Sequence, residues 1–181
     1  PHCPSCRACI SSRVDVQTFN ASKSQRRVLT KNKDLSVSSV QSIFSTEHYE
    51  LYCRYQAFKH PGGSMESFGE NEYEEFLCQS FGNSLMFETR LGEKLLAVSV
   101  TDIFGDALSA VYTFFDPEYS ARSLGTFSIL QQIKATQNRG KRHLYLGYYI
   151  KNSVKMAYKT NFMPLEMLIE GKWRRYTKDD E

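Results

Sequence analysis

The sequence predicts one α+β domain built around a mixed central β-sheet. Its 181 residues are 41% hydrophobic and 13% aromatic, enough to bury one sizeable core and too few for two ordinary domains. The hydrophobic pattern changes from a helical to an extended period near the middle of the chain. Beyond that change, strand-like and helix-like segments follow each other at short intervals, which is typical of α+β domains.

The first third of the chain is expected to be irregular and then helical. Residues 1–20 show no sustained period, so an irregular segment is expected there. A short basic helix is expected over residues 24–35. From Thr46 the tyrosines recur at a helical spacing that stops at His60, because Pro61 and two glycines follow it and deny further helix. His60 is therefore predicted at a helix end, where loops often carry function.

An antiparallel meander is expected in the middle of the chain. Residues 73–79 predict a second short helix, after which the period becomes extended. Turn residues at 91–93 and 105–106 separate three runs that alternate as half-buried strands do. The three predicted strands cover residues 85–89, 94–103 and 108–115.

The last third predicts a central helix followed by further short elements. Residues 124–138 carry an amphipathic pattern that ends before Gly140, as a C-terminal glycine requires. A strand over 143–150, a helical segment over 154–160, a strand over 165–170 and a charged tail follow. Meander, helix, strand, helix and strand is the order found in acyltransferases of the GNAT class, in which the sheet splays to admit an acyl donor.

Charge and hydropathy restrict the location and the partners. No stretch approaches the roughly 18 to 20 apolar residues that cross a bilayer, so a cytoplasmic protein without a membrane partner is expected. Because the chain begins with Pro1, a fragment or processed form is expected. The net charge is only +3, but cations gather in three runs. Both phosphate contacts and a solvated lysine-rich surface remain open for the runs at 23–33, 139–143 and 172–178.

Three cysteines near the start have a spacing that suits a metal. Cys3, Cys6 and Cys9 form a C-x-x-C-x-x-C run, which presents three thiolates to zinc or an iron-sulfur cluster. The fourth cysteine of a ferredoxin run is absent, since position 13 is Arg13. Metal ligation and an unligated segment both remain open. Two further cysteines, Cys53 and Cys78, lie on apolar helical patterns and are expected in the core.

Several segments spread over most of the chain are distinctive when they occur together and in this order. They are residues 1–9, 22–27, 52–65, 97–102, 108–117, 123–126 and 145–159. Together they resemble the aminoacyl-tRNA-protein transferases, which include arginyltransferases and bacterial leucyltransferases acting on N-terminal Asp or Glu. Members of this family carry a further segment, with another cysteine, before the first cysteine found here.

The resemblance implies a GNAT-like transferase domain over residues 36–181, after an incomplete Cys-rich and basic N-terminal segment over residues 1–35. It implies an aminoacyltransferase that moves leucine from leucyl-tRNA to proteins beginning with Asp or Glu, marking them for degradation through the N-end rule. Arginyl-tRNA is the alternative donor. Other classes are an acetyl-coenzyme A N-acetyltransferase, and a module that binds tRNA or acidic N-termini without catalysis. An aminoacyl ester is already activated, so the chemistry requires no cofactor.

Four residues are predicted as catalytic. His60 is the first candidate for the general base, because an imidazole takes up a proton near neutral pH, and Asp102 is the second. Tyr112 and Tyr148 are candidates to donate a hydrogen bond to the oxyanion or to the ribose of the terminal adenosine. A helix-capping role for His60 and core packing of the tyrosines remain open.

The predicted substrate-binding residues fall into two groups. Arg26 and Arg27 are expected to hold the acceptor carboxylate or, alternatively, tRNA phosphates. Ser123 and Gly125 open the central helix, where free backbone amides face an acyl donor, although an ordinary helix cap at Ser123 is also open. Three further substrate-binding residues are expected in the segments that carry the resemblance: Tyr55, Tyr158 and Lys159. Lys159 is expected to contact the acceptor carboxylate or the end of the tRNA.

Overall fold

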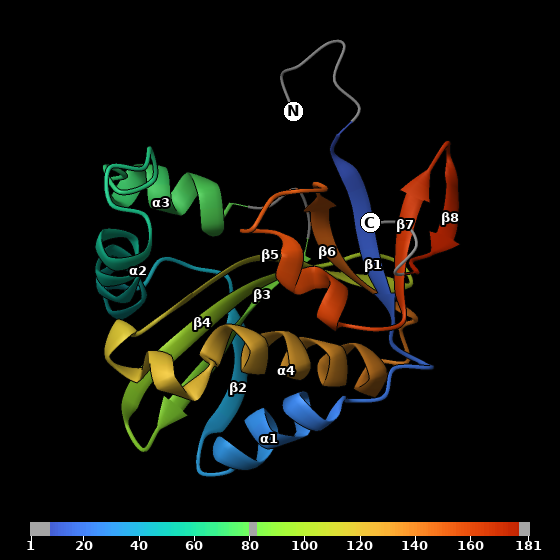
Figure 1. Ribbon diagram of the computed structural model, residues 1–181. Coiled ribbons are helices and arrows are strands. Elements are labelled where there is room, and N and C mark those ends of the chain that lie inside the picture. The colour runs from blue at the N-terminus through green and yellow to red at the C-terminus, as the bar shows by residue number, and fades with distance from the viewer. Residues whose placement is uncertain (1–7, 80–82, 178–181) are drawn as a thin grey trace.

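A computed structural model describes residues 8–79 and 83–177 of the chain, and an eight-stranded sheet forms its centre (Figure 1). The strands lie in the order β2-β3-β4-β5-β6-β1-β7-β8, and all neighbours are antiparallel except the parallel pair β5 and β6. The strands are β1 (Ile10–Asp15), β2 (Ser36–Gln41), β3 (Asn83–Leu91), β4 (Lys94–Ile103), β5 (Ala107–Phe115), β6 (His143–Tyr149), β7 (Leu165–Ile169) and β8 (Lys172–Arg175).

Helices cover both faces of this sheet. The α-helices are α1 (Lys23–Lys31), α2 (Thr46–Lys59), α3 (Glu70–Leu77) and α4 (Leu124–Asn138), and two 3₁₀ helices are η1 (Pro117–Arg122) and η2 (Ala157–Asn161). Strand β4 is buried from Leu95 to Thr101 without alternation, as a strand covered on both sides must be. Val100 belongs to the core under α2, whereas the next residue, Thr101, accepts a hydrogen bond of 2.7 Å from Gln132 on α4.

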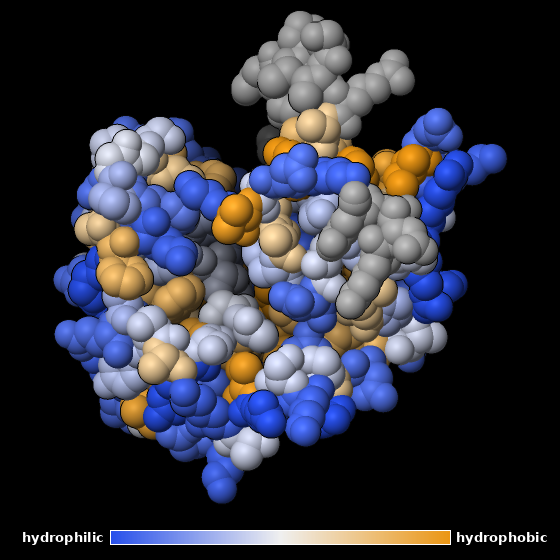
Figure 2. All heavy atoms as spheres, viewed as in Figure 1, coloured by the Kyte–Doolittle hydropathy of each residue, from blue (hydrophilic) through white to orange (hydrophobic). Residues whose placement is uncertain are grey.

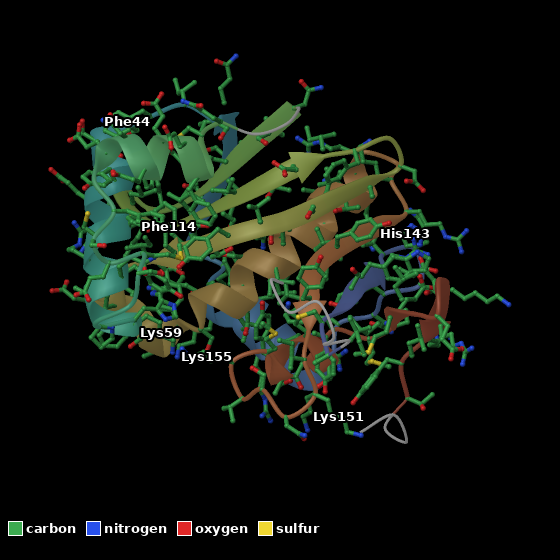
Figure 3. The ribbon with its side chains drawn as sticks, turned by 90° about the horizontal axis from the view of Figure 1, so that it is seen from above. Phe44, Lys59, Phe114, His143, Lys151 and Lys155 are labelled. Carbon is green, nitrogen blue, oxygen red and sulfur yellow. The ribbon has the colours of Figure 1, made fainter. Side chains whose placement is uncertain are left out.

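Aromatic rings fill the core between α2, α3 and the meander. The rings of Tyr52 and Phe114 meet edge to face with centroids 5.7 Å apart, and Tyr73 lies 5.0 Å from Tyr52. All three side chains are at most 1% exposed. Phe44 packs against Tyr73 from the segment before α2 (Figure 3). These contacts fix α2 on the sheet, and with it the residues at its C-terminal end.

The parallel pair β5 and β6 separates soon after it begins. Only Ala107, Leu108 and Ser109 pair with β6, the last of them with Tyr145. Beyond this point β5 continues to Phe115 and β6 to Tyr149 without pairing to each other. Figure 1 shows the two strands running apart, with η2 lying beside the place where they diverge. The predicted splay of a GNAT-like sheet is thereby confirmed.

Most predicted helices and strands are confirmed. Helix α4 has the predicted bounds, and the meander and the helix ending before His60 are found where expected. The irregular course predicted for residues 1–20 is wrong for Ile10–Asp15, since β1 lies between β6 and β7. Strand β2 was not predicted, the expected charged tail contains β8, and the segment at 154–160 shortens to η2. None of the helices in the described ranges is long and apolar enough to cross a membrane.

Candidate active site

The diverging ends of β5 and β6 form a wedge, here defined as the region between residues 110–115 of β5 and 146–149 of β6. The end of α2 and the start of α4 border it through contacts with Phe115, and η2 contacts β6. The surface is hollowed near the middle of the face seen in Figure 2. Beyond Ser109 the facing edges of β5 and β6 do not pair with each other, so the wedge offers backbone hydrogen bonds to a bound chain or acyl group, apart from the Tyr148 carbonyl, which accepts from Lys159.

Three elements meet at one side of the wedge. The ring of Tyr55 on α2 lies 4.9 Å, centroid to centroid, from the ring of Phe115 at the end of β5. A side chain added at Gly125, in the first turn of α4, would lie 3.6 Å from the Phe115 ring. The ring of His60 stands 5.9 Å from that of Tyr55. Of the predicted substrate-binding residues, Tyr55 therefore lies near the predicted base, and Gly125 lies against Phe115, which Tyr55 also contacts.

Tyr112 reaches the same place from β5 and is held by a residue that the sequence did not single out. Gln56 is fully buried, and its Nε2 donates a hydrogen bond of 2.8 Å to the Tyr112 hydroxyl. Because this oxygen accepts from Gln56, its own proton is free to be donated. Burial raises the pKa of Tyr112, so the phenol remains a donor at neutral pH. A glutamine within the apolar stripe of α2 indicates a buried polar contact, but nothing in the sequence names Tyr112 as its partner.

Electrostatic effects tie Tyr158 to this cluster. Burial raises the pKa of Tyr55, and the phenols of Tyr112 and Tyr158 raise it further by disfavouring a second negative charge. Tyr158 belongs to η2 and is 45% exposed. The wedge thus gathers three phenols from α2, β5 and η2, and their roles toward a substrate remain predictions.

The imidazole of His60 is kept neutral by its surroundings. Burial lowers its pKa, and the nearby cations of Lys155 and Lys59 lower it further. A neutral imidazole accepts a proton, whereas an imidazolium does not. His60 also caps the C-terminal end of α2, with its backbone N–H donating 2.8 Å to the carbonyl of Gln56. The capping is carried by the backbone, so the ring is available for chemistry.

Lys159 is buried behind the wedge. It is 5% exposed, and its Nζ donates to the backbone carbonyl of Tyr148. A side chain at Gly147, which has a φ of +76°, would lie 3.8 Å from this Nζ. Lys159 thus fastens η2 to the end of β6, while the Tyr148 side chain stays 45% exposed. The substrate contact expected for Lys159 remains a prediction.

Replacement of Lys159 by methionine is expected to change how stability depends on pH. Burial lowers the pKa of Lys159 from 10.5 to about 8, so the unfolded chain binds more protons than the folded chain between these values. The free energy of unfolding of the original protein, relative to Lys159→Met, should therefore rise from pH 8 to 10.5. One pKa unit corresponds to about 1.4 kcal/mol, which limits the rise to about 3 kcal/mol. Urea unfolding of both proteins across this range measures it, and parallel curves would contradict a buried, titrating amine.

The start of α4 is not an ordinary helix cap. Ser123 has a left-handed backbone with a φ of 56°, and its side chain makes no capping hydrogen bond. The first turn of an α-helix carries amides without intrahelical partners, and these favour an oxygen with negative charge. Because α4 follows β5 after η1, these amides lie at the end of the sheet where β5 and β6 diverge.

Arg26 and Arg27 lie away from the wedge. They are exposed on α1, which packs against α4, and Arg26 donates 2.5 Å to the carbonyl of Ala21. Their predicted contacts with substrate remain predictions about a separate basic surface.

Asp102 lies beside the point of divergence. It is paired across the strands with Ser109, the last β5 residue that pairs with β6, and its carboxylate accepts a hydrogen bond from Ser84. Its role as a base remains a prediction.

The predicted metal ligands fall mostly outside the described residues. Cys3 and Cys6 lie in residues 1–7, and Cys9 carries a free thiol. In the described ranges no group of three or more His, Cys, Asp or Glu side chains is arranged to hold a metal. Cys53 and Cys78 are free thiols packed against the core, as expected.

Comparison with known sequences gives consistent results. Residues 47–169 match the family described as arginine-tRNA-protein transferase, C terminus. The chain is 43% identical over 173 residues to an aspartate/glutamate leucyltransferase of Pseudomonas fluorescens, covering 96% of this chain and 74% of that protein. It is 45% identical over 174 residues to the protein of the same name in Saccharophagus degradans, again with 96% and 74% covered.

Solved structures share the fold at low sequence identity. L-PGS from Bacillus licheniformis matches with a TM-score of 0.57 at 13% identity, covering 82% of this chain and 49% of that one. A second match is the GCN5-related glucosamine N-acetyltransferase region of a fungal multi-domain GH3 β-N-acetylglucosaminidase, with a TM-score of 0.53 at 13% identity. It covers 92% of this chain and 20% of that chain. These likenesses confirm the GNAT-like fold.

Proposed function

The chain belongs to the arginine-tRNA-protein transferase family, and from this premise we propose that it transfers leucine from leucyl-tRNA to the N-terminal Asp or Glu of acceptor proteins. The observation that carries the proposal is the identity of 43% to 45% over nearly the whole chain to relatives named aspartate/glutamate leucyltransferase. The marked proteins would enter degradation through the N-end rule. The proposed donor also implies a cytoplasmic location.

The wedge supports this chemistry with residues suited to each step. The leucyl ester would lie between β5 and β6, with its carbonyl oxygen toward the Tyr112 hydroxyl and the first-turn amides of α4. The acceptor amine forms the new C–N bond, and His60 takes the proton that this nitrogen loses. The C–O bond of the ester then breaks, and the same proton passes to the departing ribose oxygen. No external energy source is needed, because the ester is more reactive than the amide that replaces it.

The acceptor amine limits how much help the base must give. An N-terminal amine has a pKa of roughly 7.7 to 8.0, so part of it is already neutral near pH 7. A neutral imidazole with a lowered pKa suits this demand, since it removes the proton only as the C–N bond forms. A strong base would be protonated at neutral pH and ineffective.

Transfer of label tests the proposal directly. The full-length protein is incubated with labelled leucyl-tRNA or arginyl-tRNA and with peptides that begin with Asp, Glu or Ala but are otherwise identical. Leucine is expected on the Asp and Glu peptides and not on the Ala peptide. If arginine alone were transferred, the donor would be arginyl-tRNA instead of leucyl-tRNA, which agrees with the description of the matching family. Transfer of neither amino acid would overturn the proposal.

A further inference from the structure

Three lysines lie at or after the ends of the elements on the two sides of the wedge. The edge of the wedge between the end of α2 and the turns after β6 is called its mouth here. Lys59 is the last residue of α2, and Lys151 and Lys155 belong to the turns that connect β6 with η2. Figure 3 shows all three on the same side of the molecule. Lys59 and Lys155 both act electrostatically on His60, so the two sides of the wedge approach each other at this residue.

The turns that carry two of these lysines are well braced. The N–H of Ser153 donates 3.1 Å to the carbonyl of Ile150, and the carbonyl of Ser153 accepts from Met156 and Ala157 at 2.9 and 3.1 Å. Lys151 and Lys155 therefore project from one compact segment. Their positions relative to the wedge are set by the backbone, not by their own side chains.

All three ammonium groups are exposed and uncompensated. Within residues 8–79 and 83–177, none of them forms an ion pair or a side-chain hydrogen bond. Other cations are neutralised, as Arg90 is by Glu47 and Glu88, and Arg122 by Asp34. The nearby carboxylate of Glu66 accepts a hydrogen bond from the N–H of Gly62 and keeps its single negative charge, which is smaller than the charge of the three lysines. The mouth of the wedge thus carries net positive charge.

We infer that Lys59, Lys151 and Lys155 form a rim that binds the phosphates of the donor's 3′-terminal strand. The inference rests on the proposed function, which places the aminoacyl ester in the wedge and so leads the strand behind it through the mouth. Cations on both sides contact such a strand as it crosses. Exposed lysines act as point charges without fixed geometry, which suits a flexible phosphate chain, whereas recognition of a single acceptor carboxylate favours the fork of an arginine.

Binding of uncharged tRNA tests the rim without any transfer reaction. The variant Lys59→Ser, Lys151→Ser, Lys155→Ser is titrated with fluorescent tRNA at several salt concentrations. Each phosphate contact to a single strand contributes about 0.7 to the slope of log affinity against log salt, so the slope should fall by about 2. The KM for leucyl-tRNA should rise about 10²-fold at about 0.1 M salt, because a slope difference of about 2 amounts to two powers of ten in affinity between 1 M and 0.1 M salt. The KM for an acidic peptide should not change.

A control variant removes the same charge elsewhere. Lys172→Ser, Arg174→Ser, Arg175→Ser changes β8, which lies three strands from β6, or about 14 Å at the usual strand spacing. The formal net charge falls from +3 to 0 in both variants, since each loses three cations. The control should keep the original slope, because β8, which carries part of the basic run at 172–178, lies at an edge of the sheet, away from the wedge.

Three results would overturn the inference. The first is an unchanged salt slope in the rim variant, and the second is an equal fall of the slope in both variants. The third is a rise in the KM for the acidic peptide alone, which would show that the lysines bind the acceptor protein. Failure of the proposed function is recognised separately, because the original protein would then bind tRNA without transferring an amino acid.

Discussion

Replacement of His60 by glutamine is expected to lower kcat/KM for an acidic acceptor peptide about 10²-fold, the lower end of the range for general base catalysis. Glutamine keeps much of the size and polarity of the imidazole but does not take up a proton. Because the backbone of residue 60 caps α2, the fold should not change. Labelled leucine transfer at subsaturating peptide measures the effect.

The pH profile separates a base from a merely structural histidine. Burial, Lys155 and Lys59 lower the pKa of His60 from its usual 6.5, so the step in activity that belongs to protonation of this imidazole should lie below pH 6.5 in the original protein. As the pH increases, activity should rise a second time at roughly pH 7.7 to 8.0, because the acceptor amine loses its proton there. His60→Gln should lose the lower step and keep the upper one. Full activity of this variant, or an unchanged lower step, would remove His60 from the mechanism.

Replacement of Tyr112 by phenylalanine is expected to lower kcat by about 10²- to 10³-fold, as the loss of one oxyanion donor does elsewhere. The KM for leucyl-tRNA should change little, because the hydroxyl acts chiefly on charge that develops in the transition state. Steady-state kinetics with saturating peptide give the two values separately. A raised KM with unchanged kcat would instead assign Tyr112 to ground-state binding.

The partner of Tyr112 supplies the control. In Tyr112→Phe the buried Nε2 of Gln56 loses its acceptor, which costs about 1–3 kcal/mol of stability. Adding Gln56→Met removes the orphaned donor and should restore the melting temperature without restoring kcat. If the double variant regains activity, the defect of Tyr112→Phe lies in folding and not in catalysis.

Local signals predicted the elements with the strongest patterns. Helix α4 was predicted with the bounds that it has, because its apolar stripe is continuous and Gly140 follows it. Strand β1 was missed because polar residues interrupt its apolar pattern, and two of them, Ser12 and Asp15, are buried together with Val14. Arg13 is neutralised by Glu166, 2.7 Å away, and this partner lies 153 residues further along the chain. Only the assembled sheet compensates such a residue, so no local pattern reveals the strand.

The site was predictable where its residues lie within matching segments and unpredictable where folding decides their position. His60, Tyr55, Tyr112 and Tyr158 do come together at the wedge. The sequence did not indicate that Gln56 would hold Tyr112, since the two are 56 residues apart. Packing between α1 and α4 likewise decides where the arginines of α1 lie, and nothing within α1 itself shows it.

The position of a bound donor tests the central claim most directly. A leucyl-adenosine analogue, with an amide in place of the ester, would be crystallised with the full-length protein. The leucyl carbonyl is expected between β5 and β6, its oxygen within hydrogen-bonding distance of the Tyr112 hydroxyl and its carbon facing His60. An analogue bound beside Arg26 and Arg27 on α1, with the wedge empty, would contradict the assignment of the active site.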